Sequence, residues 1–155
     1  MDRPSSIFRP KAADEKLLFT LKLTQAMAST KAEYFMDEII DWKRNIAFYT
    51  DEIYGLTSRL GAVIQRNSIP NIAERVEKHQ HELDVVSEKF DRLRSQFRRQ
   101  AAMLKSDSHL IDDSQMKEEI LRLQQDIRQK QQATEEKFIH TKNECQEFLA
   151  SIQKK

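Results

Sequence analysis

Apolar residues recur in alternating steps of four and three, without a break, between residues 35 and 63. The row consists of Phe35, Ile39, Trp42, Ile46, Tyr49, Ile53, Leu56, Leu60 and Val63. This heptad spacing keeps the side chains on one face of an α-helix and is typical of helices that pack along a seam. A β-strand is excluded, because steps of two would place Asp37 and Asp41 on the same face as Phe35. The pattern therefore predicts a helix over residues 30–67.

The same alternation appears twice more downstream, which predicts helices over residues 69–106 and 112–153. The second row consists of Ile72, Val76, His79, Leu83, Val86, Phe90, Leu93, Phe97, Gln100 and Leu104. The third row begins with Met116, Ile120, Leu123 and Ile127 and resumes as Gln131, Thr134, Phe138, Thr141, Cys145, Phe148 and Ile152. Between Ile127 and Thr134 the third row slips by four residues. Such an insertion predicts a local unwinding of the supercoil.

Two short connections join these three stretches. At the first connection we expect Ser68 to cap the second helix and Pro70 to lie in its first turn. At the second we expect Asp112 to cap the third helix, with Ile111 and Met116 forming a hydrophobic staple. Short connections make neighbouring helices antiparallel, so the three helices should run up, down and up.

The composition agrees with this architecture. The 155 residues include only two glycines and three prolines, while 33% are charged, so there is little material for turns and much for solvated helix faces. We therefore expect an all-α protein whose long antiparallel helices form a three-helix coiled-coil bundle over residues 30–155. This arrangement resembles a spectrin-type repeat in general build. One long antiparallel hairpin that pairs with a second copy is the alternative.

The N-terminal part differs from the rest of the chain. Pro4 and Pro10 interrupt regular helix, so residues 1–11 are expected to form a flexible tail. Residues 12–29 are expected to form an extra helical segment, although their alternating apolar residues also fit a strand, and the segment could continue into the next helix or bend away from it. This segment carries more apolar side chains than a tail needs, which makes it a candidate for docking to a partner or a second copy. The candidate docking residues are Leu17, Leu18, Phe19, Leu21, Leu23 and Met27.

Charge and cysteine usage argue against several classes of function. The 26 basic and 25 acidic residues leave a net charge of +1, which provides no overall attraction to nucleic acid or to an anionic membrane. The single cysteine, Cys145, excludes an intramolecular disulfide and favours a reducing, cytoplasmic compartment. No stretch approaches the ~20 apolar residues that a membrane span needs. There is no glycine-rich phosphate loop and no nucleophile motif, so we expect a protein that is not an enzyme and holds no cofactor.

A basic run near the end of the second predicted helix could contact a polyanion. Its candidate contacts are Arg92, Arg94, Arg98 and Arg99. Folding the second helix back onto the third would instead bring Arg99 level with Glu119, and Lys105 level with Asp113. We expect this internal neutralisation, and nucleic-acid binding is the alternative.

His79 is the one histidine on a predicted seam, where burial could make it sensitive to pH. A di-iron bundle needs Glu-x-x-His motifs, and none of the four histidines has a glutamate three residues before it. No metal ligand is therefore assigned, and a metal- or cofactor-binding bundle is kept only as a further alternative.

These patterns favour a scaffold or assembly subunit that acts through protein–protein contacts between helices. Its partner is expected to be another protein or a second copy, with a dimer as the first expectation. Phe48 and Tyr54 lie off the first seam and are the candidate partner-binding residues of the first helix. The sequence leaves open whether they face the third helix or another molecule.

Overall fold

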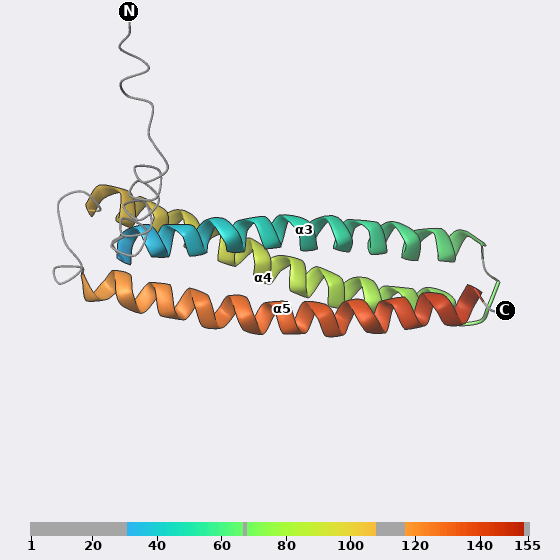
Figure 1. The fold of residues 1–155 in the computed structure, drawn as a ribbon. Coiled ribbons are helices and arrows are strands. Elements are labelled where there is room, and N and C mark those ends of the chain that lie inside the picture. Colours follow the sequence, from blue (N-terminus) through green and yellow to red (C-terminus); the bar gives the residue numbers. More distant parts are fainter. Residues whose placement is uncertain (1–30, 67, 108–116, 154–155) are drawn as a thin grey trace, which may run out of the picture.

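A computed structural model describes residues 31–66, 68–107 and 117–153 of the chain. It contains three helices of 36 residues each, which are α3 (Lys31–Arg66), α4 (Ile72–Asp107) and α5 (Glu118–Gln153). Each helix is about 54 Å long at about 1.5 Å per residue. The helices pack against one another over most of their length (Figure 1), which confirms the predicted all-α three-helix bundle.

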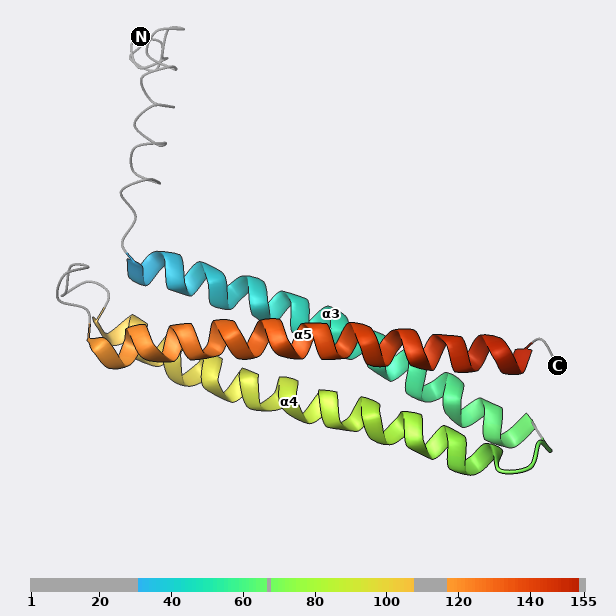
Figure 2. The same cartoon turned by 90° about the horizontal axis from the view of Figure 1, so that it is seen from below.

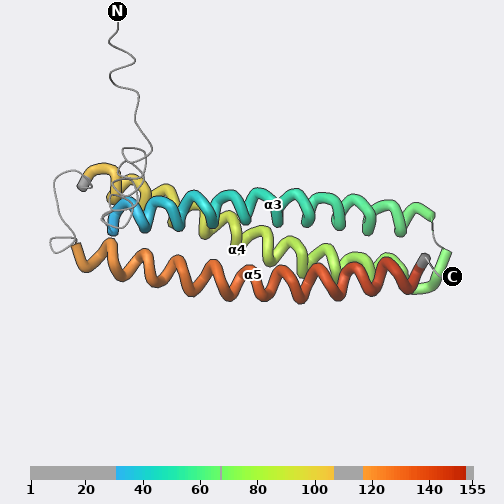
Figure 3. The backbone as a smooth tube through the Cα atoms, in the orientation of Figure 1, coloured from blue at the N-terminus to red at the C-terminus, as the bar shows by residue number. Residues whose placement is uncertain are grey.

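The chain runs out along α3, back along α4 and out again along α5, as the trace in Figure 3 shows. α3 and α5 are therefore parallel to each other and antiparallel to α4. α4 has extensive contacts with both other helices, whereas α3 and α5 contact each other less. The helices are slightly inclined to one another, which is clearest in the view from below (Figure 2).

The predicted seams form the core of the bundle. Six of the nine members of the first row are buried, and the other three, Trp42, Tyr49 and Val63, are partly exposed and pack against the core. Three aromatic residues, one from each helix, meet at mid-length: Tyr49, Phe90 and Phe138, with ring centroids 4.8–6.1 Å apart. We call this group the aromatic layer. The prediction that the helices pack along these seams is confirmed.

The start of α4 differs from the prediction. Pro70 does not lie in the first turn of the helix and Ser68 is not its cap, because α4 begins only at Ile72. Pro70 and Asn71 instead occupy the centre of a turn that is closed by the backbone N–H of Ile72 donating to the carbonyl of Ile69 at 3.2 Å. Asn71 has a φ of 65°, and proline followed by a residue with positive φ is the pattern of a type II turn. The carbonyl of Asn71 then accepts the first helical hydrogen bond, from the N–H of Arg75.

The third helix also starts later than predicted. Lys117 is not helical, and its carbonyl accepts hydrogen bonds from the N–H groups of Ile120 and Leu121, so α5 begins at Glu118 rather than at residue 112. The predicted cap at Asp112 and the staple of Ile111 and Met116 lie outside the described residues. The acidic first turn, Glu118 and Glu119, suits the positive end of the helix dipole.

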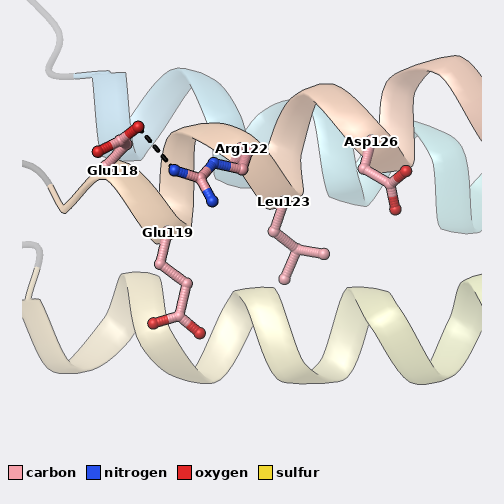
Figure 4. A pocket seen from close by; sticks show the side chains of 5 residues that line it. All are labelled: Glu118, Glu119, Arg122, Leu123 and Asp126. Carbon is pink, nitrogen blue, oxygen red and sulfur yellow. Dashed lines mark hydrogen bonds and ion pairs between the residues drawn. The ribbon is translucent and has the colours of Figure 1, made fainter.

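The predicted slip in the third seam is wrong. Gln124 is fully buried, whereas Leu123 is only partly buried and lies at the side of α5 that faces α4 (Figure 4). With Gln124 in place of Leu123, the row from Ile120 to Ile152 keeps an unbroken alternation of four and three. The supercoil therefore needs no unwinding at this point, and a polar residue takes a core position that the sequence pattern assigns to leucine.

Hydrogen bonds explain why a glutamine occupies this position. The side-chain amide of Gln124 donates to the carbonyl of Phe35 and to a carboxylate oxygen of Glu38, both at 3.1 Å. Its own oxygen accepts from Nε2 of Gln100 at 2.9 Å, and Gln100 donates also to the carbonyl of Ile120. The guanidinium of Arg128 holds Glu38 through two hydrogen bonds of 3.0 and 2.6 Å. We call Gln100 and Gln124 with these partners the glutamine layer, and it joins all three helices.

Candidate functional site

The side of α3 that faces away from α4 and α5 carries large apolar side chains in contact with solvent. The exposed fraction is 58% for Tyr34, 46% for Ile40, 62% for Phe48 and 78% for Tyr54. This answers the question that the sequence left open, because Phe48 and Tyr54 do not pack against the third helix. Ala47 lies exposed between them.

We call this surface the outer face of α3. Two residue rows form it, one on each side of a central row that contains Arg44 and Asp51. The first row is Ile40, Ala47, Tyr54 and Gly61, and the second is Tyr34, Asp41, Phe48 and Gly55. On this helix, the sequence prediction assigned partner binding only to Phe48 and Tyr54, although Tyr34 and Ile40 are also recognisable from the sequence as apolar residues off the first seam. The seven-residue spacing within each row is the signal that would have found them.

Both glycines of the chain lie on the outer face of α3. A Cβ atom added at Gly55 or at Gly61 would meet no atom within 4 Å. Neither glycine therefore serves close packing between the described helices. Each costs the helix up to about 1 kcal/mol relative to alanine, and nothing within one copy of the described chain offsets this cost.

The four candidate polyanion-binding arginines do not form one patch. Arg94 points toward α3, where it donates to the hydroxyl of Thr50 at 3.0 Å, and it also pairs with Asp91. Arg99 points toward α5, where it forms an ion pair of 3.1 Å with Glu119. The prediction that Arg99 and Glu119 lie level is confirmed, while Asp113, the expected partner of Lys105, lies outside the described residues.

The other two candidate arginines have partners within α4. Arg92 pairs with Glu88, and Arg98 donates to the hydroxyl of Ser95. The side chains of Arg92 and Glu88 are both largely exposed to solvent, so this ion pair contributes little stability. The structure thus distributes the basic residues around α4 rather than collecting them into a phosphate-binding surface.

A shallow groove between α4 and α5 contains three cationic side chains, Lys89, Arg92 and Lys130. Lys130 lies 3.0 Å from Asp126, and this hydrogen bond lowers the pKa of Asp126 below its ordinary value. A second hollow, at the start of α5, contains Glu118, Glu119, Arg122, Leu123 and Asp126 (Figure 4). Arg122 bonds Glu118 across it at 2.7 Å, and both side chains are open to solvent. Within the described part of the chain, neither hollow is lined by a buried polar side chain that lacks a hydrogen-bond partner.

His79 occupies its predicted seam position but is only partly buried. Its ring stacks on Phe148 with centroids 4.6 Å apart, and its Nδ1 atom is buried with no hydrogen-bond partner among the described residues. Burial lowers the pKa of His79 below its ordinary value. The ring is therefore held as the neutral form at neutral pH.

Cys145 is fully buried on the α5 seam, and burial raises the pKa of its thiol, so this side chain is unsuited to act as a nucleophile. Among residues 31–66, 68–107 and 117–153 there is no group of three or more histidine, cysteine, aspartate or glutamate side chains that could hold a metal ion. In the same part of the chain, no helix is both long and apolar enough to cross a membrane.

The candidate docking residues between Leu17 and Met27 lie outside the described residues. The outer face of α3 is thus the described surface that best fits a site of interaction. Comparisons of the chain with protein-family models, with curated proteins and with solved structures find no match, so the candidate site rests on the geometry alone.

Proposed function

We propose that this protein is a non-enzymatic assembly subunit or scaffold that binds another protein chain through the outer face of α3. One observation carries the proposal. Four large apolar side chains on a single helix face, Tyr34, Ile40, Phe48 and Tyr54, are each about half exposed or more. Burial of a phenylalanine contributes about 1.5–3 kcal/mol, so leaving this whole face in water is costly unless a partner covers it.

The rest of the bundle supports this choice of surface. α5 has one large exposed apolar residue, Ile139, at 51%. The described part of α4 has none that is exposed to this degree. The exposed apolar area is therefore concentrated on α3, although α3 already contributes a complete seam to the core.

The proposal is tested with a matched pair of single substitutions. Phe48→Ser removes an aromatic side chain from the outer face of α3, and Ile139→Ser removes a comparably exposed apolar side chain from α5. Each tagged variant is purified from its native source, and both the mass of the complex and its protein components are measured. We expect Phe48→Ser to lose a component that the unchanged protein and Ile139→Ser retain. If both variants retain the same components and mass, the outer face of α3 is not the binding surface.

The apolar N-terminal segment is the second proposed docking element. Deletion of residues 1–28 removes all of its candidate docking residues and leaves the described helices intact. We expect the truncated protein to lose mass or partners relative to the full chain. An unchanged mass and an unchanged set of partners would remove this segment from the proposal.

A further inference from the structure

We propose that the outer face of α3 binds the same face of a second copy of this chain, with the two α3 helices antiparallel. This inference rests on the proposed function and identifies the partner. The two-fold axis passes between the two α3 helices at the level of Ala47 and Phe48, at the centre of the exposed face. Figure 1 shows α3 along one side of the bundle, where a second bundle can approach it.

The first argument is the fit of large to small side chains. In an antiparallel pair about this axis, a residue that precedes the axis by a given number of positions lies beside the residue of the second copy that follows it by the same number. We call each such set of neighbouring residues a layer. Tyr34 then lies beside Gly61 of the second copy, and Ile40 lies beside Gly55 of the second copy. At the centre, Phe48 lies beside Ala47 of the second copy. Each of these layers combines one large exposed side chain with one small residue, and the symmetry provides each combination twice.

The second argument is the position of the two glycines. Within one copy, a Cβ atom at Gly55 or Gly61 would meet nothing, so the bundle itself does not require glycine there. In the proposed pair, both positions receive a side chain of the second copy. The close approach of two helices is a recognised use of glycine in a helix, and it offsets the propensity cost of about 1 kcal/mol for each residue.

The third argument is charge complementarity in the central row. Arg44 lies beside Asp51 of the second copy, and Asp51 lies beside Arg44 of the second copy. Both side chains are exposed, and the only ion pair of Arg44 within the described part of the chain is a long one of 3.6 Å to Asp41. In a further layer, Tyr54 lies beside Asp41 of the second copy, where its hydroxyl can donate to the carboxylate.

Charge also selects this register over its nearest alternatives. Moving the axis by half a heptad toward the N-terminus places Arg44 against Arg44 of the second copy. Moving it by the same amount toward the C-terminus places Asp51 against Asp51 of the second copy. Like charges placed in direct contact oppose association. Of these three registers, the one about Ala47 and Phe48 alone combines opposite charges with alternating large and small residues.

The test begins with the mass of the full chain in solution, measured by light scattering over a series of concentrations. We expect a dimer. Arg44→Asp places two aspartates side by side in two symmetric layers, and Asp51→Arg does the same with arginines, so each should weaken the dimer by at least about tenfold. The double variant Arg44→Asp/Asp51→Arg restores opposite charges and should restore the dimer. Arg92→Asp, at an exposed position of α4, is the control and should leave the dimer unchanged.

A second variant separates the interface from the stability of the helix. Gly55→Gln introduces a better helix former with a longer side chain. We expect it to raise the thermal stability of the bundle while weakening the dimer, because the new side chain occupies the space that Ile40 of the second copy needs. A Gly55→Gln protein with an unchanged dimer would place the contact elsewhere.

A mixing experiment tests the antiparallel direction. Ile40→Cys and Gly55→Cys are prepared as separate proteins in a Cys145→Ala background and oxidised alone and together. We expect a disulfide-linked dimer in the mixture and little in either protein alone. Cross-linking of Ile40→Cys alone would indicate parallel helices and overturn the proposed arrangement.

The inference and the proposed function fail in different ways. If the chain stays monomeric up to about 100 µM, its affinity for a second copy is weaker than a specific dimer requires. This result would overturn the inference that the partner is a second copy. If Phe48→Ser still removes another protein component, the proposed function stands. If the full chain is monomeric and deletion of residues 1–28 makes it dimeric, its own N-terminal segment covers the outer face, and the inference fails for the full chain.

Discussion

Two layers of the same core are built from residues of all three helices but with opposite chemistry. The aromatic layer consists of Tyr49, Phe90 and Phe138, and its contacts depend on shape and apolar area. The glutamine layer centres on Gln100 and Gln124, whose side chains are both fully buried and depend on directed hydrogen bonds. The two layers therefore make different contributions to a bundle with a continuous heptad seam.

An apolar heptad seam does not by itself define the alignment of three long helices. Sliding one helix by seven residues replaces each apolar contact with another similar contact. A buried amide behaves differently, because a shift leaves its donors and acceptors without partners in a medium where each loss costs about 1–3 kcal/mol. We interpret the aromatic layer as the main source of stability and the glutamine layer as the feature that fixes the register.

Removal of an aromatic side chain should have the largest effect. Phe90 is fully buried between Tyr49 and Phe138, so Phe90→Ala removes its apolar contacts and leaves a cavity. We expect the free energy of unfolding to fall by about 3–5 kcal/mol. Chemical denaturation followed by circular dichroism measures the change. Ile139→Ala, at an exposed position, should change it by less than about 0.5 kcal/mol. A loss at Phe90 as small as the loss at Ile139 would contradict the assignment of stability to this layer.

A change in the glutamine layer should lower the free energy of unfolding by less. The size of this loss should depend on whether the hydrogen-bond partner is replaced as well. Gln124→Ala removes one of the two acceptors of Gln100 Nε2 and the side-chain donor to the carbonyl of Phe35, so we expect a loss of about 1–3 kcal/mol. Replacing both glutamines, in Gln100→Leu/Gln124→Leu, removes donor and acceptor together and should cost much less than the sum of the two single leucine variants. Denaturation of the four proteins completes the cycle. Additive losses would mean that the two amides do not act as a unit.

The heptad spacing was sufficient to predict three helices, their antiparallel order and most of the core, because one face of each helix must be buried. It was not sufficient to predict Gln124 as a core residue. A pattern based on hydrophobicity favours Leu123, whereas the burial of Gln124 depends on Gln100, Phe35 and Glu38, which lie on two other helices. The stutter near Ile127 was predicted because Leu123, rather than its neighbour Gln124, was assigned to the seam.

The helix ends and the candidate site were harder to predict for related reasons. Pro70 fits either the first turn of a helix or the second position of a turn, and the choice depends on the positive φ of Asn71, which composition does not reveal. Phe48 and Tyr54 were recognised as lying off the seam. However, the sequence alone could not show whether they face another helix, because that depends on where α4 and α5 pack around α3.

The hydrogen bond at the edge of the aromatic layer provides a smaller test. The hydroxyl of Tyr49 donates to Oε2 of Glu135 at 2.9 Å, and burial together with this carboxylate raises the pKa of Tyr49 to about 12. We expect Tyr49→Phe to lower the free energy of unfolding by about 1 kcal/mol at neutral pH, because the hydrogen bond is lost and the ring remains.

The raised pKa also predicts a difference at alkaline pH. An unfolded tyrosine ionises near pH 10, whereas folded Tyr49 stays neutral to about pH 12. Its contribution to stability is therefore present below pH 10 and lost as the pH rises through this range. We expect the unchanged protein to lose more stability than Tyr49→Phe between about pH 10 and pH 12. An equal alkaline loss in Tyr49→Phe and in the unchanged protein would contradict this account.

The smallest expected effect concerns His79, at the end of the bundle far from the glutamine layer. Its ring stacks on Phe148, and its pKa is lowered chiefly by burial, while Lys78 and Arg75 lower it further and Glu82 and Glu144 act in the opposite direction. Because the folded state disfavours the charged ring, the unfolded state binds the proton first as the pH falls. Stability is therefore lost as the pH falls below the ordinary histidine value of about 6.5.

Replacement of His79 should reduce this loss. We expect the thermal midpoint of the unchanged protein to fall more than that of His79→Leu between about pH 7.5 and pH 5.5, since leucine cannot bind the proton. His81→Gln changes an exposed histidine and should retain the full loss. The effect should be modest, because His79 is only partly buried and water can solvate the protonated ring. An equal fall of the thermal midpoint in His79→Leu and in the unchanged protein would contradict this account. The acid sensitivity of the bundle would then arise from groups other than His79.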